Sequence, residues 1–586
     1  MPLPRLQHFS DEETALLAHY IFTNPLGETS MMHYNELVRA EELSPIASAV
    51  SRTHVSTVER TLDFIDKEKM AVARDLIPHI RAIVQLTRSP DGSLVVSKRA
   101  ADFNQKWVIG HGHSSIKEET QLFGFMEHIS DCALDALLGH PLSRPQVKST
   151  RYISYGEVLD RSLSDPDILR LPNPEKFLEY IRFMNRRYLE VMHVLADAVH
   201  AHPDTRAYYA WMRSEPQARE HLRIWTEQER KKGQETDLDQ AHAERHRYLN
   251  GLSLEKQRED AEKFVLDYSR MYLLAVTKTS TVFSVDARTL EEVITRMISH
   301  PRIEEQQRGR ELREEAMKLA PVLMGEKSHI REDSWYRELM TTIGQSLVER
   351  FGRPIQGHAQ KPSVRLYDPH RFQPGSDLMS AALIVFHHTN LPLDVIMECI
   401  TPSEVHDIID AAHSTRGDVN ELHPAMAHSG LFVEFMIGVH AYRDLFRHRN
   451  GHKTPQPLTT RHGFEVPEIY DTFGLTREYL KHMAYATEIF EEAYEHDPLI
   501  AQKLVPFGAL RRALHSWSPQ QVAYVTNLRG RIRTGHRSYV QVVRQLAQSF
   551  REQFPVLGAH LRVDTSEYPA HLIKRAYDWH DQGRPQ

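Results

Sequence analysis

Apolar residues recur every three or four positions between Asn173 and Pro203, which places them along one face of an α-helix. They are Phe177, Tyr180, Ile181, Met184, Tyr188 and Val191. Asn173 suits an N-cap, and Pro174 suits the first turn, where its missing N–H has no helical partner to lose. We predict an amphipathic helix that begins at Pro174 and ends near His202.

The helical pattern is interrupted by a strongly charged stretch from about residue 203 to residue 262. Large apolar residues are few there, and the run Arg230-Lys231-Lys232-Gly233 is typical of a solvated surface. We interpret the stretch as a surface insertion with helical pieces. Helical periodicity resumes between Leu254 and Thr277, and the prolines and glycines of residues 352–362 are typical of a linker.

The sequence contains an internal repeat. With an offset of 310 positions, residues 113–151 align without a gap with residues 423–461. The matching elements occur in one order: a histidine, an aromatic-methionine pair that we expect in a helix, Pro-Gln, and Thr-Arg. In the first segment these are His113, Phe125-Met126, Pro145-Gln146 and Thr150-Arg151.

A second pair of segments aligns with an offset of 241 positions. Asp286-Ala287-Arg288 matches Asn527-Leu528-Arg529, and Arg296 matches Arg537. The change of offset, about 69 residues, is close to the length of the charged insertion. Together the alignments predict a tandem duplication, with a tail at 1–29, a first copy at 30–330, a linker at 331–362 and a second copy at 363–586.

Two motifs of the first copy resemble those of flavin-dependent thymidylate synthases. Residues 112–119 resemble the GHxSxxEH element of that family: His113, Ser115 and Glu118 match, and Glu119 replaces the final histidine. Ser149-Thr150-Arg151-Tyr152 resembles the SxRY that closes the family signature RHRxxSxNExSxRY. The RHR that opens the signature is missing from this copy.

The second copy has the complementary part of the signature. Arg447-His448-Arg449 matches RHR, whereas Thr459-Thr460-Arg461-His462 replaces SxRY. The interval between the RHR position and the closing arginine is two residues longer than in the family, and the Asn-Glu pair of the signature is missing from both copies. The segments that begin at Asp286 and Asn527 resemble the NxR...R stretch of the family, and Arg270 precedes Asp286 at a similar spacing.

The resemblance implies an α+β protein with two tandem copies of the family fold, a mainly antiparallel sheet flanked by helices. Family members are homotetramers that share sites between subunits, so we expect an intramolecular pseudo-dimer that pairs into a homodimer. The implied reaction transfers a one-carbon group from methylenetetrahydrofolate to dUMP, with FAD as carrier and NADPH as reductant. This route uses no cysteine nucleophile.

The motifs supply the candidate site residues. The resemblance implies catalytic roles for Arg447 and Arg537, nucleotide binding by Ser149, Arg151, Arg270 and Arg296, and cofactor binding by His113, Ser115, Glu118, Arg447, His448, Arg449 and Asn527. An arginine can bind a phosphate through two parallel N–H donors, and a serine adds a third. We predict that Ser149 and Arg151 meet Arg447, His448, Arg449 and Arg537 in one composite site, while the reciprocal site lacks RHR.

Each assignment has a structural alternative. Ser115 and Glu118 also fit a helix capping box, Arg447-His448-Arg449 also fits a basic helix end, and the other arginines fit surface ion pairs. Two other functions remain open for the whole protein. One is a related flavin enzyme that modifies a different nucleotide, and the other is a non-catalytic nucleotide-binding or scaffold paralogue.

The length, charge and composition of the chain add expectations about its domains, partners and location. The 586 residues are too many for one hydrophobic core, and the net charge of -7 argues against a nucleic-acid coat. The sequence has neither an apolar run long enough to span a bilayer nor an N-terminal apolar signal segment, so we expect a cytoplasmic protein.

Cys132 and Cys399 are the only cysteines, and we interpret both as buried. The 36 histidines lack zinc-ligand spacing, so we expect no metal.

Overall fold

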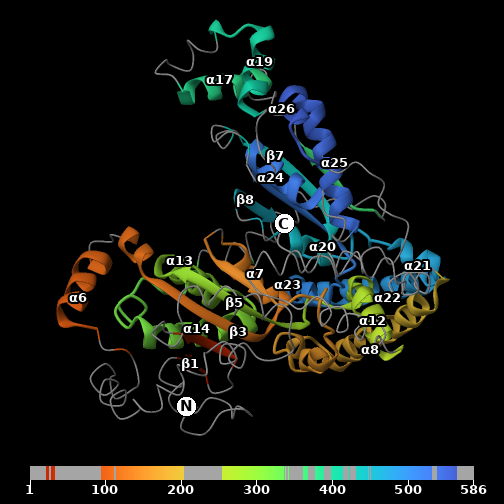
Figure 1. Ribbon diagram of the computed structural model, residues 1–586. Coiled ribbons are helices and arrows are strands. Elements are labelled where there is room, and N and C mark those ends of the chain that lie inside the picture. The colour runs from red at the N-terminus through yellow and green to blue at the C-terminus, as the bar shows by residue number, and fades with distance from the viewer. Residues whose placement is uncertain are drawn as a thin grey trace, which may run out of the picture.

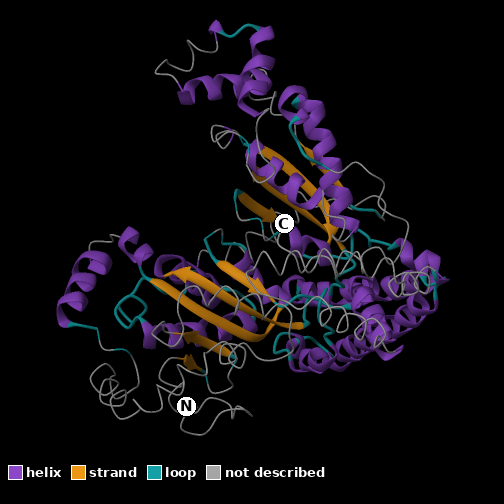
Figure 2. Cartoon of the chain, in the orientation of Figure 1, coloured by secondary structure: helices purple, strands orange, loops and turns teal. Residues whose placement is uncertain are grey.

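The structure of the chain is a computed structural model. It describes residues 21–24, 28–32, 94, 96–110, 114–140, 142–203, 254–334, 337, 341, 361–366, 376–388, 398–413, 422, 426, 430–446, 448, 450–530 and 537–563. Two antiparallel sheets lie in different halves of the chain, each with helices packed against it (Figures 1 and 2). The α+β prediction is therefore confirmed.

The first sheet is built from β1 (Ile21–Thr23), β2 (Thr29–Met32), β3 (Gln121–Ser130), β4 (Arg144–Val147) and β5 (Lys278–Asp286), in the order β1-β2-β3-β5-β4. The second is built from β6 (Ser363–Leu366), β7 (Leu431–Gly438), β8 (His452–Pro455) and β9 (Leu510–Trp517), in the order β6-β7-β9-β8. All neighbouring strands are antiparallel. Apart from the extra edge strand β1, the two sheets have the same topology.

Helices alternate with these strands. Those of the first half are α6 (Lys98–Phe103), α7 (Asp131–Leu138), α8 (Pro174–Ala201), α12 (Leu254–Ser269), α13 (Ala287–Ser299) and α14 (Ile303–Leu319). Those of the second half are α17 (Ser376–His388), α19 (Pro402–His413), α20 (Val439–Leu445), α21 (Glu468–Thr472), α22 (Thr476–His496), α23 (Pro498–Ala501), α24 (Pro519–Gly530), α25 (Arg537–Gln553) and α26 (Pro555–Ala559). Within the described part of the chain, no helix is both long enough and apolar enough to cross a membrane.

Among the described residues, buried apolar side chains form three hydrophobic cores. One core lies between the first sheet and α13 and α14, and another lies between the second sheet and α24 and α25. The third is shared by both halves, because α8 and α12 pack there with α22. Tyr180 of α8 and Tyr479 of α22 are both fully buried in it. Burial of apolar surface therefore joins the two halves directly.

A symmetric backbone contact lies within this shared core. Leu274 and Pro506 form an antiparallel bridge. On one side, Phe507 N donates to Leu273 O at 2.7 Å, and on the other Ala275 N donates to Val505 O at 3.0 Å. Adding 232 to Leu273, Leu274 and Ala275 gives Val505, Pro506 and Phe507, so each hydrogen bond is the symmetry counterpart of the other. The contact therefore has a local pseudo-twofold axis.

The strand registers correct the sequence alignment. The offset of 310 holds for β3 and β7, where Phe125 pairs with Val282 and Phe435 pairs with Ala513. The same pairs give an offset of 231 for β5 and β9, which aligns Asp286 with Trp517. The predicted match between Asp286 and Asn527 is therefore wrong by ten residues.

Several local predictions can also be compared with the structure. The helix predicted from Pro174 is α8, but Asn173 has φ 52° and makes no side-chain cap. Phe125 and Met126 are buried as expected, although in strand β3 instead of a helix. The helix from Leu254 ends at Ser269, well before Thr277.

Some boundaries of the predicted domains lie outside the described residues. These include most of the tail, residues 204–253 of the insertion and most of the linker. Strand β1 lies within the predicted tail, so the first sheet begins before residue 30. Cys132 is buried as expected, whereas Cys399 is exposed, contrary to the prediction.

Candidate functional site

Arg151 lies where the two halves of the chain meet. It follows β4 in a tight turn, in which Ser149 Oγ accepts a hydrogen bond from Arg151 N at 3.2 Å. Its Nε and Nη2 donate to the two carboxylate oxygens of Asp267 at 2.9 and 3.4 Å. Its Nη1 donates to the hydroxyl of Tyr539, on α25 of the second half, at 3.5 Å. One edge of the guanidinium is thus anchored in the first half and the other contacts the second.

The contacts continue from Tyr539 to the predicted RHR motif. Arg529 of α24 lies with its Cζ 5.5 Å from the centre of the Tyr539 ring. Arg529 Nε donates to His448 Nε2 at 3.2 Å, and His448 is buried. Arg151 and His448, which the sequence analysis placed in one composite site, are therefore connected through Tyr539 and Arg529. We call these four residues the composite cluster.

Arg270 is a second buried cation beside the composite cluster. It exposes 1% of its surface, and its Nη1 donates to Thr150 Oγ1 at 3.3 Å. Burial lowers the pKa of its guanidinium to about 9, although the nearby Asp444 carboxylate acts in the opposite direction. Its Nη2 has no hydrogen-bond partner among the described residues and lies 3.7 Å from Asp267 Oδ1. A buried donor in this state favours the binding of an anion or a carbonyl oxygen.

Carboxylates balance the arginines of this region. Asp444 of α20 lies 3.9 Å from Arg151 Nη1. Burial lowers the pKa of Arg151, but Tyr539 and Asp444 outweigh it, so the net pKa is raised above its usual range. Arg151 and Arg270 are therefore both charged at neutral pH.

The structure places the other candidate residues elsewhere. Glu118 is exposed and pairs with Arg288 at 2.6 Å. Asn527 accepts a hydrogen bond from Arg562 N at 2.7 Å. Arg537 pairs with Glu468 of α21, and Arg296 is half-buried on α13.

Four candidates cannot be placed in full. His113, Arg447 and Arg449 lie outside the described residues, as does the side chain of Ser115. Of the predicted set, the structure brings together Ser149, Arg151, Arg270 and His448. Sequence reasoning missed Tyr539 and Asp267, and it noted Arg529 without assigning it a role. An alignment with the offset of 231 would have shown that Asn527 and Arg537, the candidates that follow β9, were matched to the wrong residues of the first copy.

A small cavity lies between α7 and α20. Its volume is about 40 Å³, and its lining includes Asp131, Asp135, Arg443 and Arg511. Arg443 Nη1 contacts Asp131 Oδ1 at 2.5 Å across the boundary between the halves. Ligand pockets are typically several hundred Å³. This cavity therefore suits a few water molecules and not a nucleotide.

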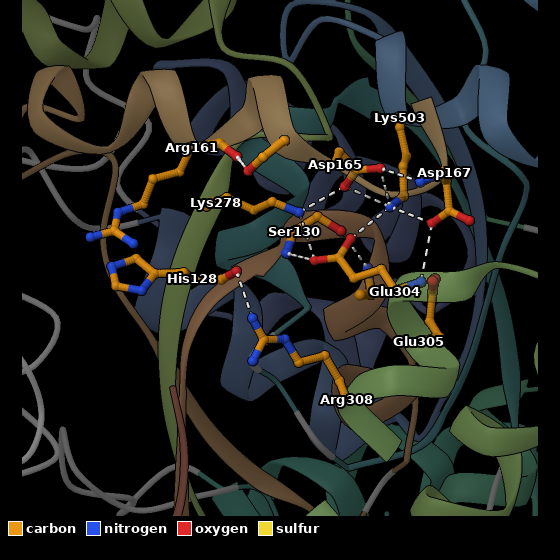
Figure 3. A network of polar contacts seen from close by, with 12 residues as sticks. His128, Ser130, Arg161, Asp165, Asp167, Lys278, Glu304, Glu305, Arg308 and Lys503 are labelled. Atoms are coloured by element: carbon orange, nitrogen blue, oxygen red, sulfur yellow. Dashed lines mark hydrogen bonds and ion pairs between the residues drawn. The ribbon is translucent and has the colours of Figure 1, made fainter. Parts of the chain in front are cut away.

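A separate ionic cluster joins the two halves (Figure 3). Lys503 Nζ contacts Asp165, Asp167 and Glu304 at 2.6–3.0 Å, and all four residues are buried. Lys278 Nζ adds contacts to Asp165 at 2.7 Å and Glu304 at 2.8 Å. Burial alone raises the pKa of Glu304, but the two lysines outweigh it and lower that pKa well below its usual value.

The same three carboxylates have the spacing of a metal site, because their oxygens lie within 4.8 Å of one another. The Lys503 ammonium, however, contacts every one of them. A lysine already supplies the positive charge that a cation would bring, so we assign no metal to this cluster.

Comparisons with known proteins were made at the levels of family, sequence and structure. No protein-family model matches the chain. The UPF0159 protein of Chlamydia muridarum is 22% identical over 493 residues, covering 82% of this chain and 84% of the relative. That of Chlamydia pneumoniae is 25% identical over 462 residues, covering 75% and 76%. That of Thermoplasma acidophilum is 24% identical over 327 residues, covering 54% and 63%.

Two solved structures are also similar in part. Both are of the UMP/dUMP methylase PolB from Streptomyces cacaoi, bound with 5-Br dUMP or with 5-Br UMP. They cover 35% of this chain and 96% of the methylase, with 13% and 14% identity and TM-scores of 0.28 and 0.27. TM-scores this low establish neither a shared fold nor a shared activity.

Proposed function

We propose that this protein is a flavin-dependent enzyme that transfers a one-carbon group to a pyrimidine nucleotide, with dUMP as the first substrate to test. The donor would be methylenetetrahydrofolate and the reductant NADPH. The observation that carries the proposal is the contact between Arg151, from the SxRY-like motif, and the Tyr539–Arg529–His448 chain, which includes the histidine of the RHR-like motif. One residue from each of two separated segments that resemble parts of one family signature is thus connected to the other through Tyr539 and Arg529.

The residues present fit the binding of anionic ligands. Arg270 has a buried donor without a hydrogen-bond partner among the described residues, and Arg151, although it contacts Asp267, Tyr539 and Asp444, lies beside it as a second buried cation. Such arginines suit the phosphate of a nucleotide or of FAD. Bound FAD would supply the redox and one-carbon carrier chemistry, and the chain would supply binding and electrostatics.

The roles of the residues follow from their positions. Arg151, with Ser149 beside it, would hold the phosphate from the first half. Arg270 remains charged in a site with little water, where a cation strongly stabilises negative charge that develops on a uracil carbonyl. His448 Nε2 accepts from Arg529, so a neutral His448 carries its proton on Nδ1.

Turnover decides between this proposal and a non-catalytic paralogue. The purified protein would be incubated with FAD, NADPH, methylenetetrahydrofolate and dUMP, and dTMP would be measured by chromatography. Formation of dTMP that is abolished in Arg270→Met supports the proposal. Binding of dUMP without any dTMP would contradict it and would favour a nucleotide-binding protein or a different one-carbon product.

A further inference from the structure

Tyr539 lies close to two arginines that come from different halves of the chain. The centre of its ring is 5.8 Å from Arg151 Cζ and 5.5 Å from Arg529 Cζ. Both distances are within the range of cation–π attraction, which reaches roughly 6 Å. The side chain is almost fully buried, with 1% of its surface exposed. The ring is therefore a common neighbour of both guanidinium groups.

Each arginine is also anchored away from the ring. Arg151 Nε donates to Asp267 Oδ1 at 2.9 Å, and Arg529 Nε donates to His448 Nε2 at 3.2 Å. Two guanidinium groups at one site repel each other, and the repulsion grows as water is excluded. An aromatic ring beside both groups offsets part of that repulsion, because its face carries negative charge density.

The position of Tyr539 is fixed by its neighbour in the first turn of α25. Ser538 Oγ donates to Glu465 Oε1, and Glu465 Oε2 lies 3.0 Å from His440 Nε2. All three residues are buried. A Cβ at Gly438 would lie 2.5 Å from His440 Nε2 and 2.7 Å from Glu465 Oε2, so this packing requires glycine there. The ring is thus placed by buried hydrogen bonds within the second half.

We propose that Tyr539 is a positioning residue that holds Arg151 and Arg529 at a fixed spacing around one phosphate-bearing ligand. The inference rests on the proposed function, because it takes a nucleotide as the anion that the arginines share. The ring face is the active element, and the hydroxyl contributes one long hydrogen bond of 3.5 Å. Phenylalanine therefore retains the effect, whereas leucine has a similar apolar character and no π face.

The test compares three variants with the wild-type protein after incubation with FAD. Binding of dUMP is measured by calorimetry for wild type, Tyr539→Phe and Tyr539→Leu at low and high salt. The matched control is Phe550→Leu, which also removes a buried aromatic ring from α25 but lies against Phe554, with ring centres 4.5 Å apart. Melting temperatures of all variants are recorded to separate folding from binding.

We expect Tyr539→Phe to bind dUMP within about threefold of wild type and Tyr539→Leu to bind about tenfold or more weakly. Binding by Tyr539→Leu should also depend less on salt, because its two arginines no longer act together on one anion. Phe550→Leu should lose stability without a comparable loss of binding.

Equal loss of binding in Phe550→Leu and Tyr539→Leu would overturn the inference, because it would trace the effect to stability alone. If the wild-type protein binds dUMP and Tyr539→Leu binds it equally tightly, the inference is also overturned, while the proposed function still stands. A wild-type protein that binds neither dUMP nor inorganic phosphate would overturn both.

Discussion

Leu274 and Pro506 face each other in an antiparallel bridge, and the hydrogen bonds on either side of it repeat with an offset of 232 positions. A duplicated fold that pairs with itself produces this kind of symmetry. Close packing beside the bridge requires a glycine: a Cβ at Gly508 would lie 2.3 Å from Tyr479 Oη. The bridge is the structural argument for the tandem duplication proposed from the sequence.

The symmetry supplies a matched pair of arginines for mutation. Arg151 and Arg461 occupy similar turns, in which the residue two positions before accepts a hydrogen bond from the backbone N–H of the arginine. Arg461 pairs with Glu491 of its own half and is 40% exposed. We expect Arg151→Ala to weaken dUMP binding about tenfold or more and Arg461→Ala to leave it within about twofold. Calorimetry checks this, and equal effects of the two variants would refute the assignment of Arg151.

We also expect one nucleotide per chain. At the offset of 232, the counterpart of Arg270 is Gln502, which accepts a hydrogen bond from Leu458 N. Helices α14 and α25 begin at Ile303 and Arg537, so their starts align Tyr539 with Glu305, a buried carboxylate. The reciprocal position thus lacks the counterparts of Arg270 and of the Tyr539 ring. Equilibrium dialysis with dUMP should saturate at one per chain, and two would show a second working site.

The Lys503 cluster should control the stability of the contact between the halves. Lys503→Met leaves three buried carboxylates without their shared cation, which should lower the free energy of unfolding by about 3–5 kcal/mol. Lys176→Met is the control, because it removes an exposed pair with Glu492 that is worth at most about 1 kcal/mol. Urea unfolding measures both. An equally small effect for Lys503→Met would mean that the cluster adds little to stability.

Stability should fall in mild acid because of buried histidines. Burial lowers the pKa of His515 to about 3, and its Nε2 lies 3.0 Å from the Tyr442 hydroxyl. In the unfolded chain His515 takes up a proton near pH 6.5, whereas in the folded chain it stays neutral down to about pH 3. The stability that neutral His515 contributes is therefore fully present above pH 6.5. It is lost as the pH falls toward 3, by about 1.4 kcal/mol per pH unit. Urea unfolding of His515→Gln should show a shallower pH dependence than wild type, and an unchanged slope would contradict this origin.

The sequence predicted well the features that local chemistry determines. The α8 helix followed from apolar periodicity and from Pro174. Phe125 was assigned to a helix because β3 is buried on both faces and its apolar run has no alternation. A continuous apolar run does not distinguish a buried strand from a helix.

Long-range pairing explains the remaining errors. The offset of 241 matched Asp286 to Asn527 by residue type, whereas strand register aligns Asp286 with Trp517. Tyr539 belongs to no motif, and its position depends on the Glu465–Ser538 contact. Lys503 gave no local signal either, because the carboxylates it contacts lie about 200 to 340 residues away along the chain. Such contacts are set by the tertiary fold.

The most direct test of the central claim is the visible absorption spectrum of the purified protein after incubation with FAD and desalting. The account predicts a retained flavin band that changes when dUMP is added, and an altered response in Arg151→Ala. A folded protein that retains no flavin would contradict the flavin-enzyme proposal.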